Sequence, residues 1–315
     1  MSAVVRHFLA DDDLTPAEQA EVLALAAQLK AAPFSRRPLE GPQSVAMIFD
    51  KPTLRTQASF GAGIAELGGN PMLVEGKLAG IGVRESVSDV ARVLGRQVSV
   101  VVWRTYAQAD LAVMARDAGV PVVNALTDDF HPCQLIADLL TVQEHLGDLA
   151  GRTVTFLGDA ACNMGNSWLL AGATAGMHVR LSGPQGYVPD AAMFARAAAI
   201  AATTGGSVAA VSDPVEAVRG VDVVVTDTWI SMGKEDEQAE RERVFGPWAL
   251  TPALLAEAAP HAIAMHCLPA YRGKEIAAEV LDGPQSVVWD EAENRRHAQK
   301  AVLTFLLERT RGSAG

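Results

Sequence analysis

The sequence contains few cysteines and no long apolar segment. Its 315 residues include three cysteines, Cys133, Cys162 and Cys267, and no two of them have the spacing of a metal-ligand or redox pair. We therefore expect neither a disulfide framework nor a structural zinc. The longest apolar runs, such as residues 100–103, have the length of a strand, whereas a membrane span needs roughly 20 residues. This composition predicts a globular protein with no membrane partner.

The sequence also lacks an excess of positive charge. It has 26 Lys and Arg against 37 Asp and Glu, so the formal net charge is −11, which argues against nucleic acid as the partner. Because the net charge repels anions, any anionic ligand would have to be bound by local arginines. The acidic run 11–13 interrupts the apolar residues near the start, so we expect no secretory signal and a cytoplasmic protein.

Short apolar runs alternate with Ala-rich helical segments along the chain. The length favours two domains, because single cores seldom grow beyond about 250 to 300 residues. The alternation predicts an α/β fold with mainly parallel sheets flanked by helices. The candidate strands are residues 45–48, 72–74, 98–103, 122–123, 154–157, 178–181, 221–225, 263–266 and 287–289.

Polar residues gather directly after six of these candidate strands. In open α/β sheets, ligands bind outside the carboxyl ends of the strands, so one bipartite site explains the clusters better than chance does. The clusters are residues 51–56, Arg104-Thr105, Asn124 with 131–134, 159–163, 227–233 and 266–269.

The first cluster has the features of an anion-binding turn. Thr53, Arg55 and Thr56 follow a strand and precede a helical stretch, and the N-terminus of a helix offers unpaired N–H donors and a partial positive charge. These residues predict a phosphate site, although an ordinary capped helix would explain them as well.

The later clusters offer donors and a carboxylate. His131 and Gln134 stand at a helix start, where they can donate hydrogen bonds to an oxygen that becomes negative, or His131 can simply cap the helix. Asn163 lies in a turn that lacks the G-x-G-x-x-G spacing of a dinucleotide site; it is either a substrate ligand or an ordinary helix start. Asp227 with Ser231 suits an amino acid that bears a second amine, or else Asp227 caps a turn.

Two further candidates lie near the end of the chain. Cys267 is either a functional thiol or, by default, a buried cysteine, because the sequence shows no base committed to it. Arg295 is either a ligand or a solvated residue of the last helix.

Together these motifs closely resemble the ornithine carbamoyltransferases, within the aspartate/ornithine carbamoyltransferase family. The resemblance covers almost the whole chain. His-Pro-Cys-Gln and His-Cys-Leu-Pro are its most specific parts, together with the first turn, and Asp-x-x-x-Ser-Met-Gly points to ornithine. The matching segments, in family order, are 51–56, 103–105, 124–126, 131–134, 158–167, 227–233, 266–269 and 293–295.

The resemblance implies transfer of the carbamoyl group from carbamoyl phosphate to the δ-amine of L-ornithine, which gives citrulline and phosphate in arginine biosynthesis. It implies no metal and no organic cofactor, and a homotrimer or a multiple of trimers. It also implies a carbamoyl-phosphate domain over residues 1–145, with a C-terminal helix at about 292–315 packing back on it, and an ornithine domain over 146–291.

The resemblance assigns site residues by motif. Carbamoyl phosphate would be bound by Thr53, Leu54, Arg55, Thr56, Arg104, His131, Gln134, Cys267, Leu268 and Arg295. Ornithine would be bound by Asn163, Asp227, Ser231 and Met232. The catalytic residues would be Arg55, Arg104, His131, Gln134, Asp227 and Cys267.

The sequence departs from the family pattern at three places. Leu54 and Gln57 stand where the family commonly has Thr and Arg, and Gly80 stands where it usually has a Gln that reaches carbamoyl phosphate; Lys77 or water could substitute for that Gln. Three alternatives stay open: another N-carbamoyltransferase acting on putrescine, aspartate or a modified ornithine, a catalytically silent binding subunit, and a nucleotide-dependent oxidoreductase.

Overall fold

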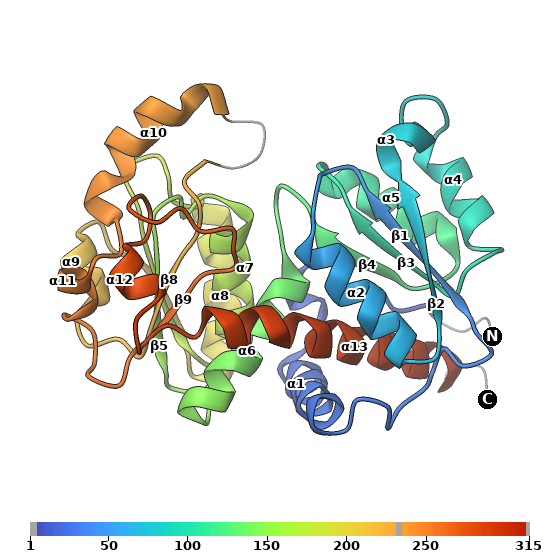
Figure 1. The fold of residues 1–315 in the computed structure, drawn as a ribbon, viewed down its shortest axis with the longest axis horizontal. Coiled ribbons are helices and arrows are strands. Elements are labelled where there is room, and N and C mark those ends of the chain that lie inside the picture. Colours follow the sequence, from blue (N-terminus) through green and yellow to red (C-terminus); the bar gives the residue numbers. More distant parts are fainter. Residues whose placement is uncertain (1–4, 231–234, 313–315) are drawn as a thin grey trace. The chain divides into compact units, whose positions relative to one another are not determined.

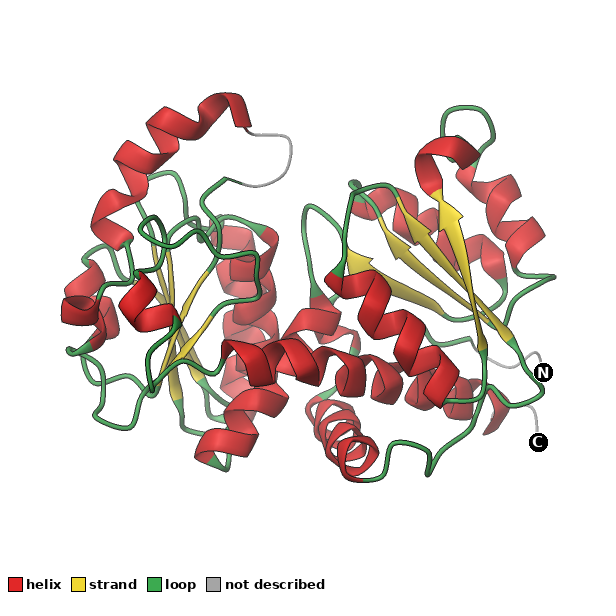
Figure 2. Cartoon of the chain, viewed as in Figure 1, coloured by secondary structure: helices red, strands yellow, loops and turns green. Residues whose placement is uncertain are grey.

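The computed structural model describes residues 5–230 and 235–312. Within them the chain forms two compact units (Figure 1). The first unit comprises the residues up to Leu140 and those from Glu293 on, and the second comprises Thr141–Ala292. Each unit has a parallel sheet flanked by helices (Figure 2), so the predicted α/β class is confirmed. No helix among the described residues combines the length and apolar character needed to cross a bilayer.

The first unit is built on a sheet of order β2-β1-β3-β4, and every pairing between neighbours is parallel. The strands are β1 (Ser44–Phe49), β2 (Asn70–Glu75), β3 (Val100–Arg104) and β4 (Val122–Leu126). The helices are α1 (Pro16–Ala31), α2 (Arg55–Glu66), α3 (Gly76–Ala79), α4 (Val87–Leu94), α5 (Gln108–Ala118) and α6 (Pro132–Leu146), with most of α13 (Val288–Gly312) and the 3-10 turn η1 (Asp11–Asp13). From β1 the chain first adds β2 on one side and then β3 on the other. The loops after β1 and β3 therefore flank the point where the strand order reverses, and ligands of open α/β sheets bind at such a switch point.

Apolar side chains and one buried ion pair join these layers. Ile48, Trp103 and Met114 belong to a core cluster in which α4 and α5 cover one face of the sheet. Elsewhere in this unit, α13 is tied to α1 and α2 through Lys300, whose fully buried ammonium contacts Glu66 and the carbonyl of Leu29. A buried ammonium costs free energy unless it is paired, so this contact fixes α13 against its neighbours.

The second unit has a sheet of order β7-β6-β5-β8-β9, again parallel throughout. The strands are β5 (Thr153–Leu157), β6 (His178–Ser182), β7 (Ser207–Ala210), β8 (Val223–Thr226) and β9 (Ile263–Met265). The helices are α7 (Asn163–Thr174), α8 (Ala191–Thr204), α9 (Pro214–Val218), α10 (Gln238–Phe245), α11 (Pro252–Leu255) and α12 (Ala278–Leu281), with 3-10 turns η2 (Glu235–Glu237) and η3 (Gly246–Trp248). The switch point of this sheet lies between β5 and β8, the strands that precede Asp159 and Asp227.

Two details of the predicted elements differ from the structure. Residues 287–289 do not form a strand: α13 begins at Val288, and only Ser286 makes an isolated bridge, with Ala264. The apolar pattern misled us because the first turn of a buried helix is as apolar as a short strand. The edge strand β7 was not predicted, because its mostly exposed Ser-Val-Ala-Ala sequence carries almost no strand signal.

Candidate active site

The turn between β1 and α2 presents backbone donors at a helix start. Leu54 is the residue just before α2, and its side chain is 76% exposed and makes no capping bond, so it contributes only its backbone. Thr53 Oγ1 accepts a hydrogen bond from the backbone N–H of Thr56 at 3.3 Å. The half-buried Arg55 opens the helix. Because α2 is three turns long, its first N–H groups and its dipole favour an anion here.

Buried cations surround this turn within the first unit. Arg104 ends β3 and Arg295 comes from α13, and both are almost fully buried. Arg295 Nη2 donates to Thr56 Oγ1 at 3.1 Å, which joins α13 to the first turn of α2. Lys51 lies over the ring of Tyr106, 4.4 Å from its centroid, and also pairs with Asp128. The chain thus concentrates positive charge at one sheet edge despite its net negative charge.

His131 is a buried imidazole beside these cations. Its pKa lies well below 6.5, first because the imidazole is buried and then because Arg295, Arg104 and Lys51 repel a further positive charge. The imidazole is therefore neutral at pH 7, with one nitrogen able to donate and the other able to accept. Such a group can polarise a carbonyl oxygen without competing with the cations for an anion.

His131 directly precedes α6, and Cys133 and Gln134 lie in the first turn of this helix. Pro132 begins the helix, and Gln134 donates from its Nε2 to Asp138 Oδ1 at 2.7 Å, one turn further on. Between them, burial raises the pKa of the Cys133 thiol to about 12, so this cysteine is a packing residue and no nucleophile.

A cavity adjoins the turn at the ends of β1 and β2. It has a volume of about 350 Å³, and both Gln57 and Lys77 line it. Gln57 is itself a departure from the family pattern, and Lys77 is the residue that could substitute for the Gln that the family usually has at the position of Gly80. Asp50 anchors this region by accepting from Trp103 Nε1 at 2.7 Å. A Cβ at residue 76 would lie 1.8 Å from an oxygen of Asp50, so only Gly76 allows the loop after β2 to pass so close. The cavity is lined by residues 49–52, Gln57, 73–75 and Lys77.

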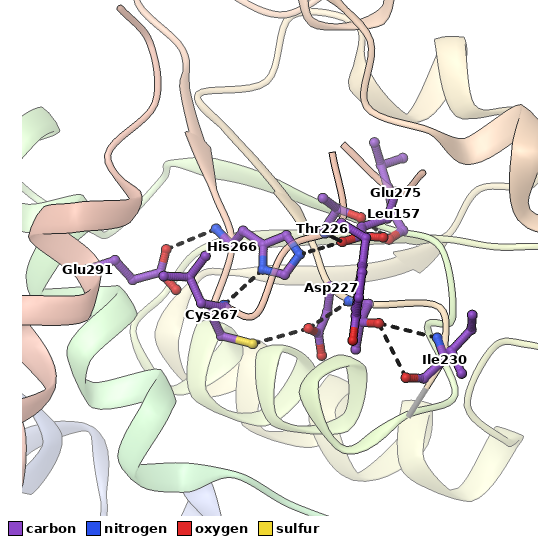
Figure 3. Close-up of polar contacts among 11 residues, drawn as sticks. Leu157, Thr226, Asp227, Ile230, His266, Cys267, Glu275 and Glu291 are labelled. Atoms are coloured by element: carbon purple, nitrogen blue, oxygen red, sulfur yellow. Dashed lines mark hydrogen bonds and ion pairs between the residues drawn. The ribbon is translucent and has the colours of Figure 1, made fainter. Parts of the chain in front are cut away.

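In the second unit, Asp227 and Cys267 meet at the ends of β8 and β9 (Figure 3). Cys267 Sγ donates to Asp227 Oδ1 at 3.3 Å, and the N–H of Thr228 donates to the same oxygen at 2.7 Å. Burial raises the pKa of Asp227, while its hydrogen bonds oppose that shift. Leu268, which follows, has a left-handed φ of 58°, a strained conformation for a non-glycine residue.

His266 holds Cys267 in place through fixed contacts on both ring nitrogens (Figure 3). Its Nδ1 accepts from the N–H of Leu268 at 2.9 Å, so its proton resides on Nε2 and is donated to the buried Glu275 at 3.2 Å. Its backbone N–H donates to Glu291 at 3.0 Å. Asp227, His266 and Cys267 have ligand atoms within 4.8 Å of one another, but both imidazole nitrogens already have protein partners. The arrangement therefore suits a hydrogen-bond relay better than an open metal site.

The remaining predicted residues of this unit lie near the other side of its switch point. Asn163 opens α7, directly after β5 and its turn. Arg241 of α10 braces that turn, since it pairs with Asp159 at 2.8 Å and donates to the carbonyl of Trp229 at 3.0 Å. Ser231 and Met232 lie outside the described residues.

Sequence reasoning missed the residues that support this site. Lys51 stands in the recognised turn but received no role, and Asp138, His266, Glu275 and Arg241 were not singled out as site residues. Lys51 and His266 had a signal, their places in the first turn and in the His-Cys-Leu-Pro motif. The others contact site residues through tertiary packing that sequence patterns do not reveal.

Two family models together match most of the chain. The family model described as the carbamoyl-P binding domain of aspartate/ornithine carbamoyltransferase matches residues 6–144. The model described as the Asp/Orn binding domain matches residues 150–306. The chain belongs to the aspartate/ornithine carbamoyltransferase family, which confirms the resemblance found in its motifs.

Particular members of that family are similar over their full length. The chain is 62% identical to an ornithine carbamoyltransferase of Clavibacter michiganensis, over 98% of this chain and 100% of that protein. It is 58% identical to one of Leifsonia xyli, over 99% and 100%. Among solved structures, the ornithine carbamoyltransferase of Pyrococcus furiosus matches with a TM-score of 0.92 at 40% identity, over 98% of this chain and 99% of that one.

The neutral state of His131 predicts a pH dependence of stability. In the folded protein its pKa is well below 6.5, whereas in the unfolded chain it is near 6.5, so the unfolded chain takes up a proton first as the pH falls. This destabilisation is negligible above about pH 7.5 and reaches about 1.4 kcal/mol at pH 5.5. Urea denaturation at both pH values should show a smaller pH-dependent loss for His131→Gln than for the wild type. Equal losses in the two proteins would contradict the assignment.

Proposed function

We propose that this chain transfers the carbamoyl group of carbamoyl phosphate to the δ-amine of L-ornithine and releases L-citrulline and phosphate. The observation that carries the proposal is the buried cationic set around the start of α2, in a chain 62% identical over its full length to an ornithine carbamoyltransferase. Nothing in the described geometry favours an oxidoreductase, because the turn after β5 lacks the dinucleotide spacing.

The first unit supplies the phosphate site. Arg55, Arg104 and Arg295 hold the phosphate oxygens, since a guanidinium keeps its charge and binds two oxygens with one planar fork. Thr53, Leu54 and Thr56 add hydroxyl and backbone donors at the helix start. His131 donates to the carbamoyl oxygen, where negative charge develops. Lys51 adds a further positive charge in this unit, and we assign Cys267 and Leu268 to carbamoyl phosphate as well.

The second unit supplies the ornithine site. Asp227, with the thiol of Cys267 beside it, orients the δ-amine, and Asn163 binds the amino-acid end. Ser231 and Met232, outside the described residues, complete the set. Arg241 acts indirectly, because it braces both the turn after β5 and the carbonyl of Trp229.

The reaction is a nucleophilic substitution at the carbamoyl carbon. The neutral δ-amine forms the new N–C bond and gives a tetrahedral intermediate, whose collapse breaks the C–O bond to phosphate. The departing phosphate takes the amine proton. A lysine-like amine titrates near pH 10, so the enzyme binds the scarce neutral form or creates it, and the rate rises with pH until that form dominates. Alignment and donors aimed at the oxyanion supply most of the acceleration.

We also propose that the protein acts in arginine biosynthesis and lies in the cytoplasm. We propose further that its two domains have the boundaries expected from the sequence. Subcellular fractionation, and arginine auxotrophy of a deletion strain relieved by citrulline, would test the first two. Separate expression of residues 1–145 with 292–315, and of 146–291, would test the third, since each piece should fold alone.

A citrulline assay tests the proposed activity. With carbamoyl phosphate as donor, we expect citrulline from L-ornithine at a rate far above any product from putrescine, aspartate or N-acetyl-L-ornithine, because Asp227 together with Ser231 suits an unmodified amino acid that bears a second amine. Preference for one of the other acceptors would assign the chain to a different N-carbamoyltransferase. No product from any acceptor would favour a silent binding subunit.

The substitution Arg55→Ala tests the phosphate role. We expect a loss of about 10²–10³-fold in citrulline formation with little change in the free energy of unfolding, because a preorganised charged donor is removed from a half-buried position. Arg92→Ala, at an exposed arginine of α4, is the matched control and should retain full activity. Near wild-type turnover in the Arg55 variant would refute the role.

We propose a homotrimer, or a multiple of it, as the assembly. Support comes from two large apolar side chains that are exposed after the edge strand β2 in the first unit, Leu78 and Val83, at 78% and 93% exposure. Sedimentation equilibrium should give three times the 33.2 kDa of the chain, or a multiple of that. Leu78→Glu should shift the distribution towards smaller species. A monomer or dimer for the wild type would contradict the proposal.

A further inference from the structure

The proposed reaction gives no role to Asp138, a buried carboxylate of the first unit. Asp138 lies on α6 one turn after Gln134, and neither side chain is exposed to solvent. Burial of a carboxylate is costly unless it has partners, so its retention in the interior calls for a reason.

The contact between Asp138 and Gln134 fixes which way the amide points. The two atoms in contact are Gln134 Nε2 and Asp138 Oδ1, 2.7 Å apart. The amide nitrogen is the donor and the carboxylate oxygen is the acceptor, so the nitrogen of Gln134 faces Asp138. A half-turn of the amide would set the oxygen of Gln134 against a carboxylate oxygen, and two facing acceptors in a buried site cost free energy.

This orientation decides what Gln134 can offer a substrate. With its nitrogen committed to Asp138, the amide directs its carbonyl oxygen away from that carboxylate, as an acceptor. A carbamoyl group has an acceptor oxygen, which suits the donor His131, and an NH₂ group, which suits an acceptor. Gln134 then recognises the carbamoyl nitrogen, in place of the donor role that the sequence suggested for it.

We propose that Asp138 is a positioning residue that holds the amide of Gln134 with its oxygen towards the carbamoyl nitrogen, and so makes the site select carbamoyl phosphate over acyl phosphates. The inference rests on the proposed function. Acetyl phosphate is the discriminating ligand, because it has a methyl group in place of the NH₂ and is otherwise nearly the same shape. A site that hydrogen-bonds an N–H rejects an analogue that lacks it.

A purely structural role makes a different prediction. Gln and Asp four residues apart on a helix stabilise it by a few tenths of a kcal/mol at most. If that were the whole role of Asp138, its replacement would alter the unfolding midpoint and leave the preference between the two phosphates unchanged.

The test compares the wild type with Asp138→Asn, which keeps the shape but lets the amide of Gln134 face either way. We expect the ratio of the dissociation constants of acetyl phosphate and carbamoyl phosphate, measured by calorimetry, to fall about tenfold, as for one hydrogen bond. The value of kcat should fall as well. Asp138→Ser, which can both donate and accept, should give the same loss of preference and serves if the Asn variant does not fold.

The control is Asp222→Asn, another carboxylate-to-amide change. Asp222 accepts from the N–H of Thr153 and from Arg152 at the amino end of the second sheet, opposite to the polar strand ends. It should lose stability and keep the wild-type ratio.

A second measurement asks whether Asp138 acts through Gln134. In a Gln134→Ala background the preference should already be low, and adding Asp138→Asn should not lower it further. An unchanged ratio in Asp138→Asn and Asp138→Ser, or independent effects in the double variant, would overturn the proposal. Because the ratio is a binding measurement, it stands apart from the citrulline assay: a wild type that binds selectively but forms no citrulline would refute the proposed function alone.

Discussion

Buried positive charge at the carboxyl edge of the first sheet is the constraint on which the rest of this unit depends. Arg104 and Arg295 are withdrawn from water in a chain of net charge −11, and each would be costly there without nearby acceptors. The topology makes this possible, because β1 and β3 end side by side and α13 reaches the first turn of α2 through Arg295. Burial, and after it the charges of Arg295, Arg104 and Lys51, lower the pKa of His131 and keep this neighbour uncharged. A ligand with two negative charges would offset the cost of this buried positive charge most.

The second unit has acidic rather than basic residues at the carboxyl ends of its strands. Asp227, Glu275 and Glu291 are acids near the carboxyl ends of β8 and β9, and they are partnered by Cys267 and His266 (Figure 3). A group that carries an amine fits such an acidic set, just as a phosphate fits the basic set of the first unit. The family models divide the chain in the same sense, with a carbamoyl-P domain first and an Asp/Orn domain second. The charge in each unit therefore has the sign that suits the substrate after which its family model is named.

The sequence predicted what depends on local pattern, and it missed what depends on packing. The α/β class, most strands and the anion-binding turn follow from apolar runs and from hydroxyl and guanidinium groups at a helix start. The run 287–289 was wrongly interpreted, because apolar residues do not distinguish a strand from the first turn of a buried helix. Asp138 and Glu275 have no local signal at all, since acidic residues are usually exposed and only the tertiary fold buries these two. The proximity of Gln57 to Lys77 likewise arises from two separate strands that end at one cavity.

The two units share one device for making a neutral side chain specific. An amide and a neutral imidazole can each present either a donor or an acceptor in nearly the same shape, so placing them is not enough to define their chemistry. In the first unit Asp138 selects one face of Gln134, and in the second unit Glu275 and the N–H of Leu268 select one tautomer of His266. A buried carboxylate suits this task because it only accepts, and because the low dielectric makes the wrong orientation expensive. Burying these acids costs free energy, but it fixes which atoms of Gln134 and His266 donate and which accept. Charge by itself cannot fix that pattern.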